Sequence, residues 1–272
     1  MKISWKTKVF LYRLRYSVVV FCRAPYLFEN WFYFFVSRFT EKSGILRFRT
    51  GLKMNIRPKT SDRATITEMF VVRPYERKDL GYEIQPSDTV LDVGANIGAF
   101  SLKAAYRNNL AIIYSLEPVK HLYDQLCKNV RINECKNIHT YNLAMDAQDG
   151  DRKLNVSDSM SSFYFGDEGK GTQTVKTVSL SSFLTTHQIS QIDFLKMDCE
   201  GAEFDIIPNT SSETLRCINR IAMEFHNRSA EQTVTLLKSD LESKGFEVDV
   251  CVGEWNGILL ARNTNFQARK FV

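Results

Sequence analysis

The sequence predicts an α/β fold built on a seven-stranded, mostly parallel sheet that ends in an antiparallel hairpin. An apolar, β-branched run at Val90–Val93 turns sharply at Gly94 into an amphipathic segment, the pattern of a buried strand that leads into a helix. Further strand-like and helix-like runs then alternate toward the C-terminus, which is typical of a parallel sheet. The last two strand-like runs have no helix between them, and this indicates the final hairpin.

The periodicity places the individual elements. Strands are expected at 90–93, 111–116, 138–143, 192–197, 218–225, 246–252 and 257–261. Helices are expected at 62–72 with Asp62 as cap, and at 97–107, 119–133, 179–186 and 230–244, the last one ended by Gly245. Alternation at 45–57 predicts an additional hairpin that turns at Thr50 and Gly51, and a small β excursion at 153–156 and 172–178 encloses a loop rich in Ser, Gly and Asp.

Charge divides the chain into two parts. Residues 1–63 carry 14 Lys and Arg and 3 acids, a net charge of +11, so the remainder carries −6 of the total of +5. With 272 residues and 44% hydrophobic content, the chain can bury one large core. We therefore expect a basic, aromatic, helical extension at 1–44 and a single larger domain at 45–272.

Aromatic and basic residues are interleaved through residues 5–40. The charged residues leave no apolar run of the roughly 18 residues that a membrane span needs, and they break up the centre of a secretory signal. Three roles stay open for this segment: a cap packed on the domain, a homodimer contact, or peripheral contact with an anionic membrane. RNA binding is a fourth and ranks lowest, because the domain that follows is acidic. The six cysteines form no Cys-x-x-Cys pair, which indicates reduced core thiols in a cytoplasmic protein.

The strand-to-helix turn has features of a nucleotide site. Its glycines are spaced Gly94-x3-Gly98, unlike the Gly-x-Gly-x-x-Gly of NAD-binding domains. Asp92 before the turn would repel a pyrophosphate but suits the ammonium and sulfonium groups of S-adenosyl-L-methionine. Glu117 ends the next apolar run 19 residues after Gly98, where an acid that binds a ribose is expected. Asn96, between the glycines, tolerates a left-handed backbone.

Three motifs resemble the FkbM family of S-adenosylmethionine-dependent methyltransferases: Asp-Val-Gly-Ala-Asn-Ile-Gly at 92–98, Ser-Leu-Glu-Pro at 115–118, and Asp-Phe-Leu-Lys-Met-Asp-Cys-Glu-Gly-Ala-Glu at 193–203. The likeness spans roughly residues 45–262. It implies a class I methyltransferase fold, S-adenosyl-L-methionine as cofactor and O-methylation of a sugar, glycan or small molecule. We expect the cofactor to contact Asp92, Gly94, Ala95, Asn96, Gly98, Glu117 and Ala144. Glu68 and Tyr75 are each either a further contact or a residue without a role in the site.

Candidate catalytic residues follow the fourth and fifth strands of the predicted sheet. Asp198 ends the fourth strand and Glu200 follows it, while Glu224 and His226 share one face at the end of the fifth. An alcohol acceptor needs a base, and His226 is our first candidate, with Asp198 or Glu224 as orienting group or alternative base. Alternatively, Asp198, Glu200 and His226 could bind a metal ion, although their spacing is not diagnostic of a metal site.

Other functions are less consistent with the sequence. A nucleic-acid methyltransferase would need a basic crevice, whereas the basic charge lies in the N-terminal extension. A non-catalytic protein that binds adenosylmethionine would keep the cofactor motifs and transfer no methyl group. An NAD oxidoreductase is disfavoured by Asp92 and the glycine spacing.

Overall fold

The computed structural model describes residues 17–72, 74–156, 163–165, 172–226, 232–251 and 256–266. The chain divides into two compact units, residues 1–73 and 74–272. The hairpin therefore falls in the first unit, whereas we expected it to begin the second. Packing explains the difference: the Phe28 and Phe48 rings meet edge to face at 4.8 Å, and the Glu29 amide donates to the Arg47 carbonyl.

The first unit combines short helices with the expected hairpin. A helix through residues 17–27 is followed by α2 (Trp31–Val36), η1 (Ser37–Phe39), β1 (Gly44–Arg47), β2 (Lys53–Ile56), α3 (Asp62–Thr67) and the π-helical turn η2 (Glu68–Val72). Asp62 is not the cap that we expected. Ser61 precedes the helix, and the Asp62 carboxylate instead pairs with the Arg57 guanidinium at 2.7 Å. Among the helices described, none has the length and apolar character needed to cross a membrane.

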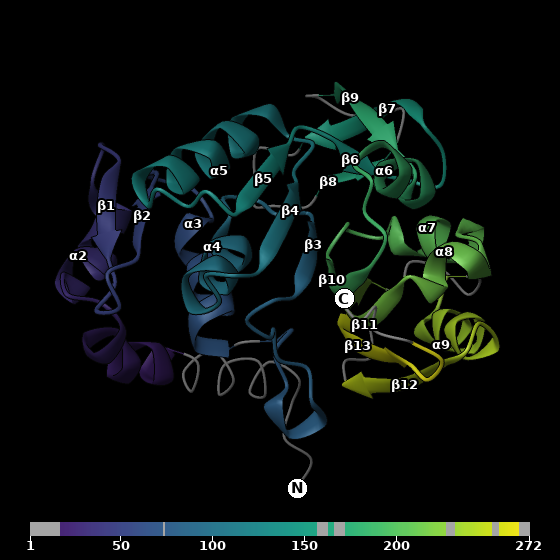
Figure 1. Ribbon diagram of the computed structural model, residues 1–272. Coiled ribbons are helices and arrows are strands. Elements are labelled where there is room, and N and C mark those ends of the chain that lie inside the picture. The colour runs from purple at the N-terminus through teal and green to yellow at the C-terminus, as the bar shows by residue number, and fades with distance from the viewer. Residues whose placement is uncertain are drawn as a thin grey trace, which may run out of the picture. The chain divides into compact units, whose positions relative to one another are not determined.

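The second unit is built on the seven-stranded sheet that the sequence predicts (Figure 1). Its strands are β3 (Thr89–Val93), β4 (Ile112–Leu116), β5 (Ile138–Tyr141), β10 (Ile192–Met197), β11 (Ile218–His226), β12 (Phe246–Cys251) and β13 (Asn256–Asn263). They lie in the order β12-β13-β11-β10-β3-β4-β5, and β13 runs antiparallel to both of its neighbours. The strands that follow β3 in the sequence, β4 and β5, lie on one side of it, and β10 lies on the other. This reversal of strand order creates a crevice at the carboxyl ends of β3 and β10.

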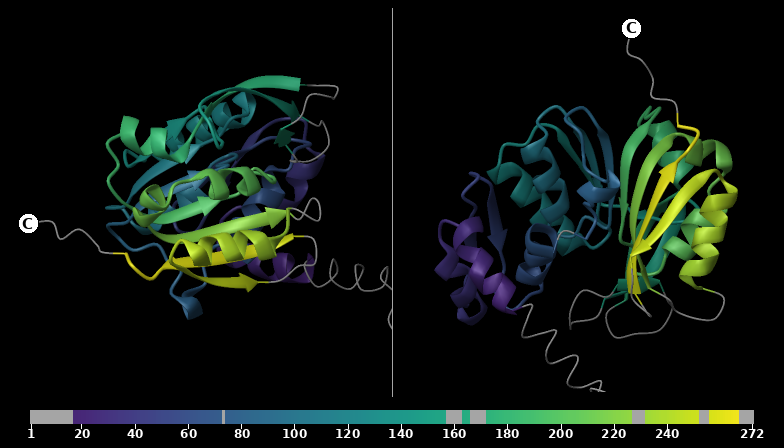
Figure 2. Two further views of the ribbon diagram at one scale, coloured as in Figure 1. Left: turned by 90° about the vertical axis from the view of Figure 1, so that its right-hand side faces the viewer. Right: turned by 90° about the horizontal axis from the view of Figure 1, so that it is seen from below.

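Helices cover both faces of this sheet, as Figure 2 shows in its right-hand view. One face carries α4 (Ala99–Arg107) and α5 (Lys120–Ile132), drawn in teal, and the other carries α6 (Leu180–Thr186), α7 (Glu203–Asn209), α8 (Ser212–Arg216) and α9 (Val234–Ser243), drawn in green to yellow. Alternation along β3 divides its side chains between the faces. Leu91 and Val93 join the apolar core under α6, α7 and α9, while Asp92 faces Ser101 of α4.

A second, four-stranded sheet confirms the expected β excursion. It contains β6 (Ala144–Met145), β9 (Thr172–Val178), β7 (Gly150–Val156) and β8 (Phe163–Phe165), in that order. Most of the loop between β7 and β9 lies outside the described residues, as does the expected start of the helix at 230. The six cysteines are free as expected. Cys199 and Cys217 are half-buried and pack against the apolar core, whereas Cys22 is exposed and is not a core thiol.

Candidate active site

The turn after β3 adopts the left-handed backbone that the sequence predicts. Gly94, Asn96 and Gly98 have φ values of 75°, 50° and 84°. A Cβ on Gly94 would lie 2.0 Å from the carbonyl oxygen of Asp198, so the turn touches the end of β10. Only a glycine allows this approach, which brings the two strand ends of the crevice together.

Glu117 ties this turn to the end of β4. Its Oε2 accepts a hydrogen bond from the Asn96 amide and its Oε1 accepts one from the Val119 amide, both at 2.8 Å. Burial raises the pKa of Glu117 to about 7, although both amide bonds and the charge of Lys196 act in the opposite direction. Each carboxylate oxygen has a further lone pair, so Glu117 can still accept hydrogen bonds from a ligand.

Asp92 is fully buried and lies beneath the turn. Its Oδ2 accepts a hydrogen bond from the Ser101 hydroxyl at 2.5 Å, and its Oδ1 lies 3.2 Å from the Lys196 ammonium. Burial acts to lower the pKa of Lys196, but the charges of Asp92 and Asp198 raise it overall, so the lysine stays protonated. The ammonium also donates to the Gly94 carbonyl at 2.8 Å. Asp92 and Lys196 therefore support the turn from below.

A pocket opens at the carboxyl edge of the sheet, beside these strand ends. Its lining is mainly apolar and includes three acids: Val93, Gly94, Glu117, Pro118, Leu143, Ala144, Met145, Leu154, Asp198, Cys199, Glu200 and Ala202. Five residues expected to contact cofactor or substrate are in this lining: Gly94, Glu117, Ala144, Asp198 and Glu200. Asp92, Ala95, Asn96 and Gly98 are not, because the first supports the turn and the others form its backbone. Glu224 and His226 are not in the lining either, and His226 lies between Glu224 and the Glu200 of the lining.

The candidate catalytic residues lie together, as the strand pattern predicts. His226 Nε2 lies 3.5 Å from Glu224 Oε1 and 3.8 Å from Glu200 Oε2, and all three side chains are partly exposed. Glu200 reaches the imidazole from the β10–α7 turn, where it has a φ of 53°. A non-glycine residue in this region is strained, which is common at functional sites.

Tyr75 connects two of the acids. Its hydroxyl lies 3.1 Å from Asp198 Oδ2 and 3.0 Å from Glu224 Oε2, and it can donate its proton to one of them at a time. The tyrosine is almost fully buried, and the Lys196 ammonium lies 5.4 Å from its ring centre. Tyr75 thereby fixes the end of β10 relative to the end of β11.

Glu203 has a structural role. It is fully buried, and its Oε1 accepts a hydrogen bond from the Cys199 amide at 2.6 Å. Burial raises the pKa of Glu203 to about 7. This hydrogen bond braces the turn that carries Glu200. Within the described residues, no group of three or more His, Cys, Asp and Glu side chains is arranged to hold a metal ion.

Comparison with known proteins identifies the family. The model of the methyltransferase FkbM domain matches residues 92–261, more than half of the chain. The chain belongs to the FkbM methyltransferase family. The β3 turn and the β10–α7 turn both lie within the matched residues, and the sheet is that of a class I, Rossmann-like methyltransferase.

Similar proteins include other methyltransferases. The FkbM chain is 23% identical over 205 residues to Methyltransferase 1 of Beauveria bassiana, with 65% of this chain and 80% of that protein covered. It is 22% identical over 158 residues to the hexuronic acid methyltransferase AglP of Haloferax volcanii, with 58% and 64% covered. Among solved structures, precorrin-6y C5,15-methyltransferase of Geobacter metallireducens matches at 15% identity and a TM-score of 0.43, covering 66% of this chain and 82% of that one.

Two residues of the FkbM site lacked an assigned role at the sequence level. Lys196 stands in an apolar strand, two residues before Asp198, and a charge within a buried run is the signal that could have identified it. Tyr75 was expected to be either a further contact or a residue without a role in the site, because no motif surrounds it. Its two carboxylate partners are 123 and 149 residues away, so only tertiary structure reveals the contact.

Proposed function

We propose that this FkbM-family protein uses S-adenosyl-L-methionine to methylate a hydroxyl group on a sugar, glycan or small metabolite. The observation that carries the proposal is the juxtaposition of two features at one sheet edge. The mainly apolar pocket with Glu117 in its wall also contains Asp198 and Glu200, and Glu200 lies beside His226. A cofactor site and a candidate base thus meet at the crevice where α/β sheets bind ligands.

The residues of the pocket fit the cofactor. Glu117 offers carboxylate lone pairs to a ribose diol, and the apolar wall at Pro118, Leu143 and Ala144 suits an adenine ring. Gly94 has no side chain to fill the space above the strand end. When bound, S-adenosylmethionine supplies a methyl carbon that is activated by its sulfonium. The pocket residues would position this group and exclude water.

His226 is suited to remove the proton of an acceptor hydroxyl. Glu224 and Glu200 lie beside Nε2, so a proton held at that atom is stabilised by two carboxylates. Asp198 lines the pocket and is oriented by Tyr75, which makes it the alternative base. This division of roles follows the general rule that a base is oriented by a third group.

The acceptor class and the location rest on separate observations. A hexuronic acid methyltransferase among the relatives supports a sugar as acceptor, at 22% identity. We also propose that the enzyme works in the cytoplasm, which is supported by six free cysteines, since thiols persist mainly in reducing compartments.

The test of the base is the variant His226→Ala. We expect it to lower the rate of label transfer from isotope-labelled adenosylmethionine to acceptors in a cell lysate by roughly 10² to 10⁴, and to leave cofactor affinity nearly unchanged. His139→Ala is the matched control, because His139 is an exposed histidine on β5 outside the pocket lining. Normal turnover by His226→Ala would remove the histidine from the mechanism and favour Asp198.

A further inference from the structure

The first unit contains a large groove that the proposed methyl transfer does not use. It lies among the helix at 17–27, the α2–η1 segment and α3, and its volume of 660 Å³ is within the range of ligand-binding pockets. Its walls include the apolar side chains of Val18, Phe21, Phe35 and Phe39. The groove therefore offers an apolar surface where the helices leave room for a ligand.

Large apolar side chains around the groove are exposed. Phe39 is 77% exposed, Phe21 is 61% exposed and Val18 is 53% exposed. Val20 and Ala24, in contrast, form the buried side of the helix. The helix thus has apolar residues on its buried side and also on its exposed side, a pattern that marks interaction surfaces.

Two arginines add positive charge to the groove. Arg38 lies with its guanidinium 5.1 Å from the Phe39 ring centre, and Arg63 lies 5.8 Å from that of Phe34. Arg63 also donates to the carbonyls of Phe34 and Phe35. In the part of the chain that the structure describes, neither guanidinium pairs with a carboxylate. Burial and, second, the charge of Arg38 lower the pKa of Arg63, so the two positive charges act on each other.

This combination fits one kind of ligand. An anion beside Arg38 and Arg63 would relieve their repulsion, and an acyl chain would cover the exposed phenylalanines. A free phosphate ion would satisfy only the arginines, and an apolar protein surface would leave their charges without a partner. The net charge of +11 on residues 1–63 attracts anionic surfaces over a longer range.

We propose that this groove docks the protein on an anionic lipid bilayer, with a lipid phosphate held by Arg38 and Arg63 and with Phe21 and Phe39 in the acyl region. The proposal concerns a different surface from the methyl-transfer pocket and does not depend on it. The bound form is peripheral, because contact is made by short helices and side chains lying at the interface.

Sedimentation with vesicles tests the proposal. We expect the full-length protein to sediment with phosphatidylglycerol/phosphatidylcholine vesicles at 0.1 M salt, to bind phosphatidylcholine alone weakly, and to dissociate at 1 M salt. Arg38→Glu and Phe39→Ser should each lower the partition coefficient about tenfold. Arg38→Lys keeps the charge, and its partition coefficient should stay within about threefold of the wild-type value. This variant separates a loss of charge from a loss of folding.

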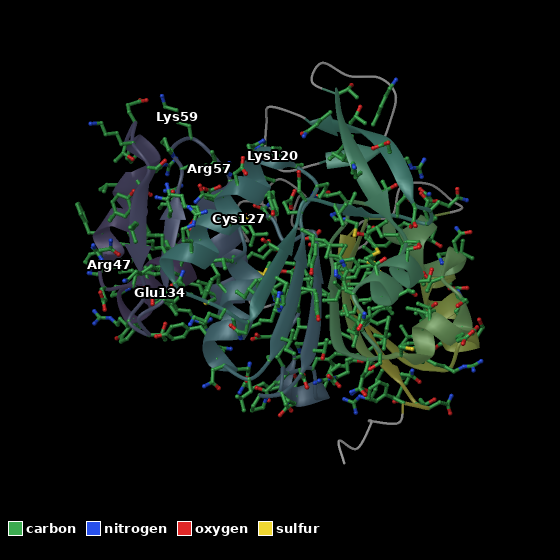
Figure 3. The ribbon with its side chains drawn as sticks, turned by 45° about the horizontal axis from the view of Figure 1, so that its top comes forward. Arg47, Arg57, Lys59, Lys120, Cys127 and Glu134 are labelled. Carbon is green, nitrogen blue, oxygen red and sulfur yellow. The ribbon has the colours of Figure 1, made fainter. Side chains whose placement is uncertain are left out.

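The matched control is Arg47→Glu, since Arg47 is an exposed arginine on β1 outside the groove and is labelled in Figure 3. A reduction by Arg47→Glu equal to that by Arg38→Glu would overturn the groove as the lipid site. Absence of binding to anionic vesicles at 0.1 M salt would overturn the proposal altogether. A third result would also overturn it: the wild type does not bind the vesicles, and sedimentation velocity shows a dimer that Phe39→Ser dissociates. The groove would then hold a second copy of the chain.

Discussion

Glu117 links the pH of the solution to the affinity for the cofactor. Burial raises the pKa of its carboxyl to about 7, so the free protein takes up a proton there as the pH falls through 7. Ribose hydroxyls donate to the ionised carboxylate, and protonation removes an acceptor. Binding therefore favours the ionised form, and affinity should fall as the pH drops below about 7 and level off above it.

Calorimetry with 5′-methylthioadenosine tests this expectation, because this fragment has the ribose diol but lacks the amino-acid groups that titrate near neutral pH. Between pH 5.5 and 8.5, we expect the wild-type affinity to rise and then level off. Glu117→Gln should bind more weakly and show no such dependence. A flat wild-type profile would mean that Glu117 does not bind the ribose or is already ionised throughout this range.

Single residues also show what the sequence could and could not predict. The positions of Glu224 and His226 followed from strand alternation, since side chains two apart share a face. The surroundings of Asp92 did not follow. Its position before the turn suggested a direct contact with the cofactor, but the sequence cannot show that Lys196 of a neighbouring strand is paired with it.

At the scale of elements, the junction of β3 and β10 depends on Gly94. The variant Gly94→Ala would place a Cβ 2.0 Å from the carbonyl oxygen of Asp198, at a φ of 75° that favours glycine. We expect it to lower the free energy of unfolding by about 1 to 3 kcal/mol and to weaken cofactor binding.

Denaturant unfolding measures the effect of this substitution. Gly150→Ala is the control, because Gly150 also has a positive φ but a Cβ there would meet its nearest atom at 3.9 Å. Gly150→Ala should lose only the unfolding free energy that backbone strain costs, and it should leave cofactor binding unchanged. Equal losses of stability in both variants would show that the close approach to Asp198 contributes nothing.

Elements with a clear periodicity were predicted well. The expected strands at 192–197 and 172–178 agree with β10 and β9, because β-branched and apolar runs between turn residues are unambiguous there. The start of α3 was less predictable. Asp62 has the residue type of a cap, but a buried pair with Arg57 uses its carboxylate, and this competition depends on the fold of the hairpin.

At the scale of the whole molecule, the chain combines a basic unit that carries an apolar groove with a larger unit that carries the pocket. Composition alone showed that the two parts differ in charge. It did not show that the hairpin at 44–56 belongs to the first unit, because membership is set by aromatic contacts such as that of Phe28 with Phe48. Tertiary packing therefore decides the boundary.

The central claim is that the pocket at the carboxyl edge of the sheet binds S-adenosylmethionine. Titration calorimetry of the full-length protein with S-adenosylhomocysteine, the demethylated product, tests it most directly. We predict binding of one molecule per chain, weakened by about 1 to 3 kcal/mol in Glu117→Ala through the loss of charge-assisted hydrogen bonds, and no tight binding of NAD. Tight binding of NAD, together with no binding of S-adenosylhomocysteine or S-adenosylmethionine, would contradict the claim.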